Sequence, residues 1–196
     1  MFVQIIEGRV RDAEELKAMG EEWRRDLRPG AAGFLGATSG ATADGRAITV
    51  VRFEDEAAAQ ANAARPEQSA FWERMAKLYD GDITFTESTD VTHLLGGGSD
   101  GAGFVQVMKN TGLDRDRAEQ LDEALTPFVD QRGDVLGGVR IWTGADTCTE
   151  VVYFTSEAEA RQGEKLEMPE EVATAMAQAM DGVEVEYLDL TDPLVH

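Results

Sequence analysis

The sequence predicts an α+β protein built from two copies of a β-α-β-β-α-β unit. Three observations lead to this fold class: the chain repeats itself, both copies show the same order of strand-like and helix-like segments, and the strands are apolar on both faces. Residues 2–6 (FVQII) recur as residues 104–108 (FVQVM), and residues 50–53 (VVRF) recur as residues 151–154 (VVYF). Self-similarity at a nearly constant offset over almost the whole chain indicates a tandem duplication.

The segment between the copies has the composition of a linker. Residues 95–103 contain five glycines in nine positions, which favours a flexible coil over a further helix or strand. We therefore expect a first repeat over residues 1–94, a linker over residues 95–103 and a second repeat over residues 104–196.

The first half of copy one reads as a strand followed by a helix. Residues 2–6 are short, apolar and strand-like. Asp12 can cap a helix that extends to about residue 28, because its carboxylate can accept hydrogen bonds from the first free N–H groups. Pro29 and Gly30 end this helix. Its apolar positions lie on one stripe at helical spacing, at Leu16, Met19, Trp23 and Leu27.

The second half of copy one reads as two strands, a broken helix and a last strand. A second helix is expected to start at Asp55 and to be interrupted at Pro66, and copy two repeats this order with a break at Pro169. The three strands are expected at residues 33–38, 47–53 and 83–86, with a turn between the first two at residues 43–45.

Apolar side chains on both faces of the strands predict how the sheets pack. Phe2 and Ile6 point to one face, and Val3 and Ile5 point to the other. Two helices cover only one face of a four-stranded sheet, and an exposed apolar face of that size is a liability. We therefore expect the sheets of the two copies to pack face to face into an intramolecular, closed or nearly closed α/β barrel with the helices outside.

The composition limits the classes of partner. A formal net charge of −20 argues against nucleic acid and against an anionic membrane surface. No apolar run is long enough for a membrane span and the N-terminal region lacks the basic start of a signal peptide, so we expect a cytoplasmic protein. The single Cys148 excludes an internal disulfide, and no side-chain group has zinc-ligand spacing. We expect no metal and no cofactor.

Several stretches of the chain resemble a known family. They are residues 53–57 (FEDEA), the break at residues 65–68 (RPEQ) and the closing pair at residues 80–81 (DG), within copies of β-α-β-β-α-β order. They resemble the antibiotic-biosynthesis monooxygenase-like group of dimeric α/β-barrel, ferredoxin-like proteins, and the resemblance covers both copies. It implies two ferredoxin-like repeats and a small hydrophobic ligand held between sheet and helices. Members include cofactor-independent oxygenases acting on aromatic polyketides, haem-degrading enzymes and proteins without known activity.

The positions that the resemblance assigns to haem binding are not kept. The haem-degrading members place an Asn at the end of the first strand, a Trp on the helix after the third strand, and an iron-ligating His further along. Copy one has Asn62 in place of the Trp and Trp72 in place of the His, and its first strand ends near Ile6. Copy two has Gly163 and Ala173 at the two helical positions. We do not expect haem degradation.

Four residues of copy one are candidates for ligand binding: Gln4, Arg52, Asn62 and Trp72. A pocket needs apolar walls with a few convergent polar groups, and copy two lacks the amide and the indole at its matching helical positions. We therefore expect a ligand between the sheet and the second helix of copy one. The alternative is that Gln4 pairs with Gln106 across the pseudo-twofold axis, Arg52 lies on the surface and Trp72 belongs to the core.

Neither histidine is an expected catalytic residue, and the function stays open between two classes. His93 is expected in a solvated loop and His196 at a frayed chain end. The first function is a cofactor-free oxygenase that oxidises a small aromatic or polyketide-like molecule. The second is a non-catalytic pseudo-dimer that binds a small ligand or has a structural role. In both cases the expected partner is a small hydrophobic or aromatic molecule, and association into a homo-oligomer is left open.

Overall fold

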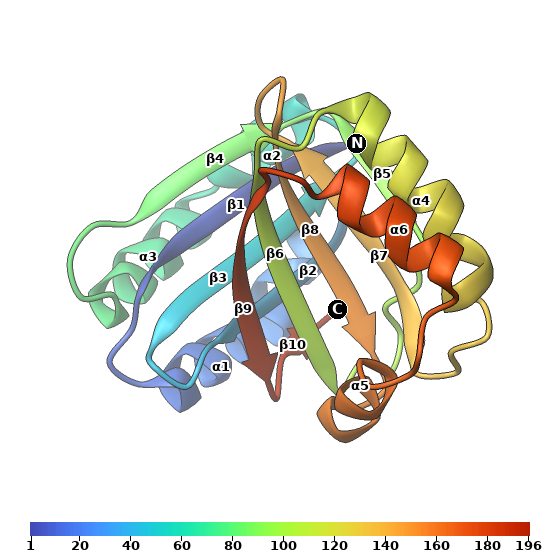
Figure 1. The fold of residues 1–196 in the computed structure, drawn as a ribbon. Coiled ribbons are helices and arrows are strands. Elements are labelled where there is room, and N and C mark those ends of the chain that lie inside the picture. Colours follow the sequence, from blue (N-terminus) through green and yellow to red (C-terminus); the bar gives the residue numbers. More distant parts are fainter. The chain divides into compact units, whose positions relative to one another are not determined.

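The computed structural model describes residues 1–196, apart from the side chain of Thr191. The chain divides into two compact units (Figure 1). Unit 1 comprises Met1–Asp90 and Leu190–His196, and unit 2 comprises Val91–Asp189. Each unit contains one five-stranded sheet and several helices. The predicted α+β class with two ferredoxin-like repeats is therefore confirmed.

The sheet of unit 1 has the strand order β10-β2-β3-β1-β4, and its neighbouring strands run antiparallel. The central pair is β1 and β3, in which Phe2 lies opposite Phe53. The strands are β1 (Phe2–Arg9), β2 (Phe34–Ala41), β3 (Arg46–Phe53), β4 (Thr84–Ser88) and β10 (Leu194–Val195).

The helices of unit 1 begin where the sequence predicts them. The Asp12 carboxylate accepts hydrogen bonds from the backbone N–H groups of Glu14 and Glu15 at 2.9 and 3.1 Å, and Asp55 accepts one from Ala58 at 2.8 Å. The helical elements are α1 (Ala13–Glu22), the π-helical turn η1 (Trp23–Leu27), the 3₁₀ turn η2 (Arg28–Gly30), α2 (Glu56–Ala63), α3 (Pro66–Met75) and the 3₁₀ turn η3 (Ala76–Leu78).

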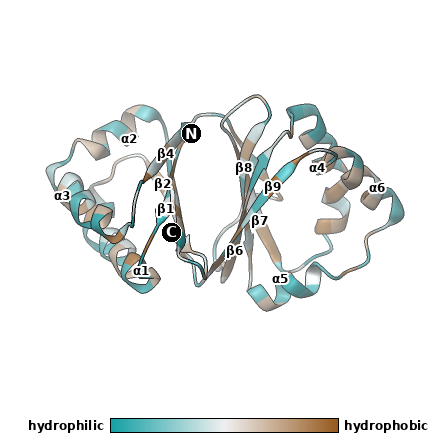
Figure 2. Cartoon of the chain, turned by 60° about the vertical axis from the view of Figure 1, so that its left-hand side comes forward, coloured by the Kyte–Doolittle hydropathy of each residue, from teal (hydrophilic) through white to brown (hydrophobic). Residues whose placement is uncertain are grey.

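Unit 2 repeats this arrangement, with the strand order β5-β7-β8-β6-β9. Its strands are β5 (Val91–Leu94), β6 (Phe104–Thr111), β7 (Val135–Trp142), β8 (Thr147–Phe154) and β9 (Glu184–Thr191). Its helices are α4 (Arg115–Val129), α5 (Glu157–Gly163) and α6 (Glu170–Ala179). Figure 2 shows α1, α2 and α3 on one face of the unit 1 sheet, and α4, α5 and α6 on one face of the unit 2 sheet.

The strand registers of the two units are consistent with a duplication. Phe104 lies opposite Phe154 in unit 2, as Phe2 lies opposite Phe53 in unit 1. In both units the pairing of the second strand with the third is interrupted at an equivalent place, just before Gly36 in unit 1 and just before Gly137 in unit 2. Positions in one unit can therefore be compared with positions in the other, residue by residue.

The closed or nearly closed barrel expected from the sequence does not form, because the ten strands make two separate five-stranded sheets. Each sheet instead gains a short fifth strand at one edge. Strand β10, from the last residues of the chain, pairs with β2, and β5, which follows the first repeat, pairs with β7. These two strands form hydrogen bonds with backbone groups of β2 and β7 that would otherwise be unpaired at the sheet edge. Neither was predicted.

Candidate ligand-binding cavity

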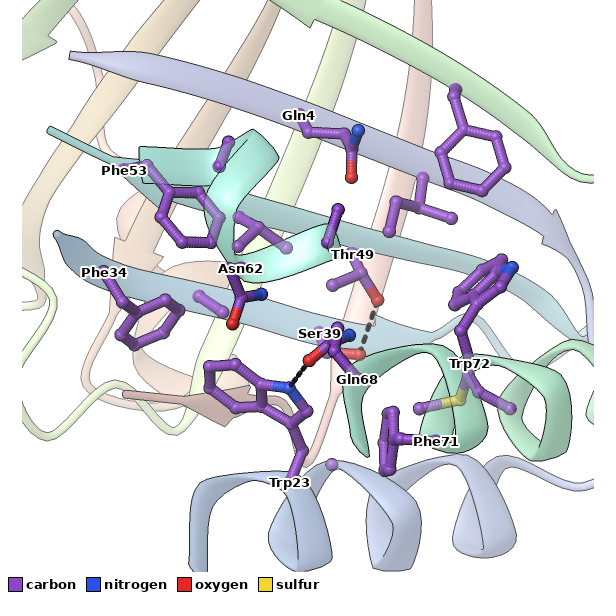
Figure 3. Close-up of a pocket in the computed structure, with 18 of the residues that line it drawn as sticks. Gln4, Trp23, Phe34, Ser39, Thr49, Phe53, Asn62, Gln68, Phe71 and Trp72 are labelled. Atoms are coloured by element: carbon purple, nitrogen blue, oxygen red, sulfur yellow. Dashed lines mark hydrogen bonds between the residues drawn. The ribbon is translucent and has the colours of Figure 1, made fainter. Parts of the chain in front are cut away.

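Unit 1 contains a cavity of about 530 Å³ between its sheet and its helices (Figure 3). This volume lies within the roughly 300–1,000 Å³ that is usual for sites that bind small organic molecules. The lining residues come from strands β1 to β4, from the three helices and η1, and from residues 79, 194 and 196.

Alternate residues of the two central strands form the floor of the cavity. These are Phe2, Gln4, Ile6, Thr49, Val51 and Phe53. Successive side chains of a strand point to opposite faces, so Arg52 points away from the cavity that its neighbours line. Arg52 lies opposite Val3, which is fully buried on that other face. The expectation that Arg52 contributes to the pocket is corrected, because a strand that is apolar on both faces does not reveal which face meets the helices.

The roof of the cavity is held together by contacts between its first and last helices. The indole Nε1 of Trp23 donates a hydrogen bond to Oε1 of Gln68 on α3 at 2.7 Å (Figure 3). One residue earlier, Glu22 forms an ion pair with Arg74 of α3. Trp23 also opens the π-helical turn η1, a geometry that is rare and often found at functional sites.

Aromatic rings line two sides of the cavity. The Trp23 ring lies 4.8 Å from that of Phe34, and Phe34 lies 5.8 Å from Phe53 in an edge-to-face arrangement. On the other side, Trp72 contacts Phe85 edge to face at 5.3 Å. Figure 3 shows Trp23, Phe34 and Phe53 on one side and Trp72 on the other. A flat aromatic molecule between them would meet ring faces and edges at both ends.

Polar groups interrupt the apolar floor at three points. Nε2 of Gln4 donates a hydrogen bond to Oε1 of Glu87 at 2.8 Å. The hydroxyl groups of Ser39 and Thr49 lie 2.8 Å apart and share a hydrogen bond. Burial raises the pKa of Tyr79, and a hydrogen bond with Thr49 opposes this rise only in part, so the phenol stays protonated at neutral pH. These three hydroxyl groups are hydrogen-bonded to one another, which leaves one hydroxyl proton to donate to a ligand.

Asn62 is a buried amide on the helix side of the cavity. Nη1 of Arg65 donates hydrogen bonds to Oδ1 of Asn62 at 2.9 Å and to the carbonyl oxygen of Leu27 at 3.1 Å. Because a guanidinium group can only donate, this contact fixes the orientation of the amide, and its Nδ2 group is left to donate to a ligand. The structure thus brings Gln4, Asn62 and Trp72 together around one cavity.

His196 also lines the cavity, which the sequence did not indicate. It follows β10, and its backbone N–H and C=O groups exchange hydrogen bonds with Ala37 at 3.0 and 2.6 Å. Its ring lies 6.1 Å from Trp23, nearly parallel to it, and 6.2 Å from Phe34. The expectation of a frayed chain end is corrected, because backbone pairing with β2 fixes the residue. His93 is exposed, but the expectation of a loop is corrected, because the residue lies on strand β5 opposite Val139.

The charged side chains that line the cavity are acidic. Glu56, Glu73 and Glu87 are exposed and therefore lie where the cavity opens to solvent. Among the lining residues of this described cavity there is neither Lys nor Arg. The charges disfavour an anionic ligand and are compatible with a neutral or cationic one.

Unit 2 has large charged side chains at positions where unit 1 has small, uncharged residues. The strand registers match Arg140 with Ser39 and Glu150 with Thr49, and the repeat matches Asp122 with Gly20. The Arg140 guanidinium donates to Oε1 of Glu150 at 2.6 Å and to both carboxylate oxygens of Asp122 at 2.7 and 2.8 Å. These side chains occupy space that stays open in unit 1.

A second substitution closes unit 2 further. Gly163 stands at the position that Asn62 holds in unit 1, and the Arg132 guanidinium lies so close to Gly163 that a Cβ atom there would collide with it. Arg132 is held in place by a two-point ion pair with Asp134, at 3.1 and 2.6 Å. The predicted difference between the two copies at the Asn62 position therefore has a structural basis.

Two general observations concern metals and membranes. Among the described residues, no group of three or more His, Cys, Asp or Glu side chains could hold a metal ion. Within the same part of the chain, every helix is too short or too polar to cross a bilayer.

Burial raises the pKa of the Cys148 thiol to about 11, so this group stays protonated and is not a nucleophile at neutral pH.

No protein-family model matches the sequence, and no curated protein matches it. Solved structures do match. A candidate monooxygenase from Fusobacterium nucleatum subsp. nucleatum aligns with a TM-score of 0.76 and 11% identity, covering 100% of this chain and 93% of that one. A candidate monooxygenase from Lactobacillus acidophilus aligns with a TM-score of 0.70 and 14% identity, covering 100% and 98%. An anthrone oxidase-like protein aligns with a TM-score of 0.62 and 11% identity, covering 99% and 92%. These similarities show a shared fold.

Proposed function

We propose that the unit 1 cavity binds a small, flat aromatic molecule and that the protein oxidises it with molecular oxygen without a cofactor. The observation that carries the proposal is the cavity of about 530 Å³ with aromatic rings on two sides and amide and hydroxyl groups between them. The fold shared with candidate monooxygenases and with an anthrone oxidase-like protein supports the choice of chemistry.

Anthrone is a suitable model substrate because it supplies the electrons itself. Loss of a proton from its methylene carbon leaves an electron pair delocalised onto the carbonyl oxygen, and this electron-rich anion reduces O₂. Overall, one anthrone and one O₂ give one anthraquinone and one water, so atoms and electrons balance. The protein has to bind the flat ring, exclude bulk water and stabilise the developing oxyanion. Nδ2 of Asn62 and the one hydroxyl proton that the hydrogen bonds among Ser39, Thr49 and Tyr79 leave over are the donors available for that last task.

The first test measures binding and oxidation separately. Anthrone is titrated into the protein without oxygen while tryptophan fluorescence is recorded, since Trp23 and Trp72 line the cavity. Oxygen uptake is then measured after air is admitted, and ¹⁸O₂ should place one labelled atom in the quinone. Anthrone in buffer without protein corrects for spontaneous oxidation.

The duplication supplies a matched pair of variants. Phe85 lines the cavity and is 48% exposed, and the repeat matches it with Tyr187 of unit 2, which is 56% exposed. Phe85→Ala should weaken anthrone binding, and Tyr187→Ala should leave it unchanged. Binding without protein-dependent oxygen uptake would favour the non-catalytic alternative. If anthrone and related neutral aromatic molecules do not bind, the proposal is refuted.

A further inference from the structure

The cavity contains one group that can change its charge near neutral pH. His196 is the histidine among the lining residues. Its Nδ1 atom is buried and has no hydrogen-bond partner in the described structure. A buried polar atom without a partner is unfavourable, and such atoms are uncommon in folded proteins.

The position of His196 is fixed rather than incidental. Two backbone hydrogen bonds with Ala37 hold the residue against β2, and Leu194, two positions earlier, is buried. A side chain larger than that of Gly20 would collide with Leu194. The imidazole itself packs beside Trp23 and Phe34, the rings that form one wall of the cavity. A ligand lying against that wall would come within reach of the imidazole.

The surroundings keep this imidazole uncharged at neutral pH. Burial lowers the pKa of His196, and the nearby positive charges of Arg24 and Arg28 lower it further, while Glu21 opposes the shift. Arg52 lies at the same end of the sheet, against Gly36. An uncharged imidazole can accept a proton, whereas an imidazolium ion cannot.

We propose that His196 is the proton acceptor for an acidic C–H or O–H group of the aromatic molecule bound in the cavity. This rests on the proposed function of the cavity. With anthrone, a methylene C–H bond breaks, the proton moves to an imidazole nitrogen, and the electron pair stays on the ring system as an enolate. The carboxylates of Glu56, Glu73 and Glu87 are poorer candidates, because they are exposed to solvent and a carboxylate is a weaker base than an imidazole.

Hydrogen–deuterium exchange of anthrone without oxygen tests this step directly. In D₂O, each proton transfer and return replaces a methylene hydrogen of anthrone by deuterium, which mass spectrometry detects. His196→Gln and His196→Phe should slow protein-dependent exchange by about 100-fold or more, the contribution usual for a positioned base. His93→Gln is the control, since His93 is exposed on β5, and it should exchange anthrone at the wild-type rate.

Two further measurements separate this role from a structural one. Anaerobic binding of anthrone should survive in His196→Phe, which keeps a ring beside Trp23. Wild-type exchange should decline as the pH falls below 6.5 and His196 takes up a proton, and this decline should vanish in His196→Gln. If the wild-type protein binds anthrone and the His196 variants exchange it equally fast, the inference is overturned while the binding proposal stands. If the wild-type protein does not bind anthrone, both are overturned.

Discussion

The buried ion pairs of unit 2 allow a quantitative test of why the two units differ. Arg140 is 4% exposed and is hydrogen-bonded to Glu150, which is 8% exposed, and to Asp122. Burial alone would lower the pKa of Arg140, but Asp122 and Glu150 raise it above its ordinary value, so this guanidinium stays charged. Arg140→Ala would leave the Glu150 carboxylate buried without its partner.

Removing one partner of a buried ion pair costs about 3–5 kcal/mol. The Asp122 side chain is 36% exposed and can regain water, so we expect a loss near the lower limit, about 3 kcal/mol. With a denaturant dependence of about 2 kcal/mol per M urea, the midpoint of the affected unfolding transition should fall by about 1.5 M. Far-ultraviolet circular dichroism during urea unfolding measures this shift.

Two companion variants make the test specific. Arg161→Ala removes ion pairs with Glu157, Glu164 and Asp189 that are all partly exposed, so it should cost less than about 1 kcal/mol. Arg140→Ser combined with Glu150→Thr recreates the Ser39–Thr49 pair of unit 1 and should be more stable than Arg140→Ala, because no buried carboxylate is left unpaired. The reasoning fails if Arg140→Ala costs less than about 1 kcal/mol, or if the double variant is the less stable of the two.

Three further predictions concern unit 1. Trp72→Ala should weaken anthrone binding by more than roughly 1 kcal/mol in a fluorescence titration while the protein stays folded; unfolding without a separate effect on binding would make Trp72 a core residue only. Residues 1–94 produced alone lack β10 and should aggregate or self-associate in light scattering, and a stable, dispersed monomer would contradict this. Burial lowers the pKa of His196 from 6.5, so the unfolded chain takes up a proton more readily than the folded chain as the pH falls. The contribution of uncharged His196 to the free energy of unfolding is therefore complete above pH 6.5 and is lost as the pH falls below it. Urea unfolding at pH 7.5 and 5.5 should show a smaller loss in His196→Gln than in wild type, and an equal loss would count against the buried imidazole.

Local patterns were enough to predict most of the fold. Helical spacing, the caps at Asp12 and Asp55 and the recurrence of strand segments depend on residues close in sequence, and these elements formed where expected. The two short edge strands escaped prediction because a two- or four-residue strand has little pattern of its own. Their pairing with β2 and β7 is decided by contacts between segments far apart in the chain.

The same distinction applies to the cavity. Asn62 and Trp72 were singled out because the second copy has Gly163 and Ala173 at their positions, a difference that two aligned copies display directly. Arg52 was assigned to the wrong face because both faces of its strand are apolar. His196 carries no local signal at all, since its place beside Trp23 depends on β10.

The late arrival of β10 has a consequence for synthesis of the protein. Unit 1 includes residues up to Asp90 and then residues from Leu190 onwards, so the ribosome must add the whole of unit 2 before the sheet of unit 1 receives its last strand. At about 5–20 residues per second, that interval lasts roughly 5–20 s. During this time the nascent chain presents β2 as an unfilled edge, and the cavity has neither Leu194 nor His196. A ribosome that stalls within unit 2 would therefore leave a first unit that is nearly complete in length yet unable to carry out proton transfer at His196.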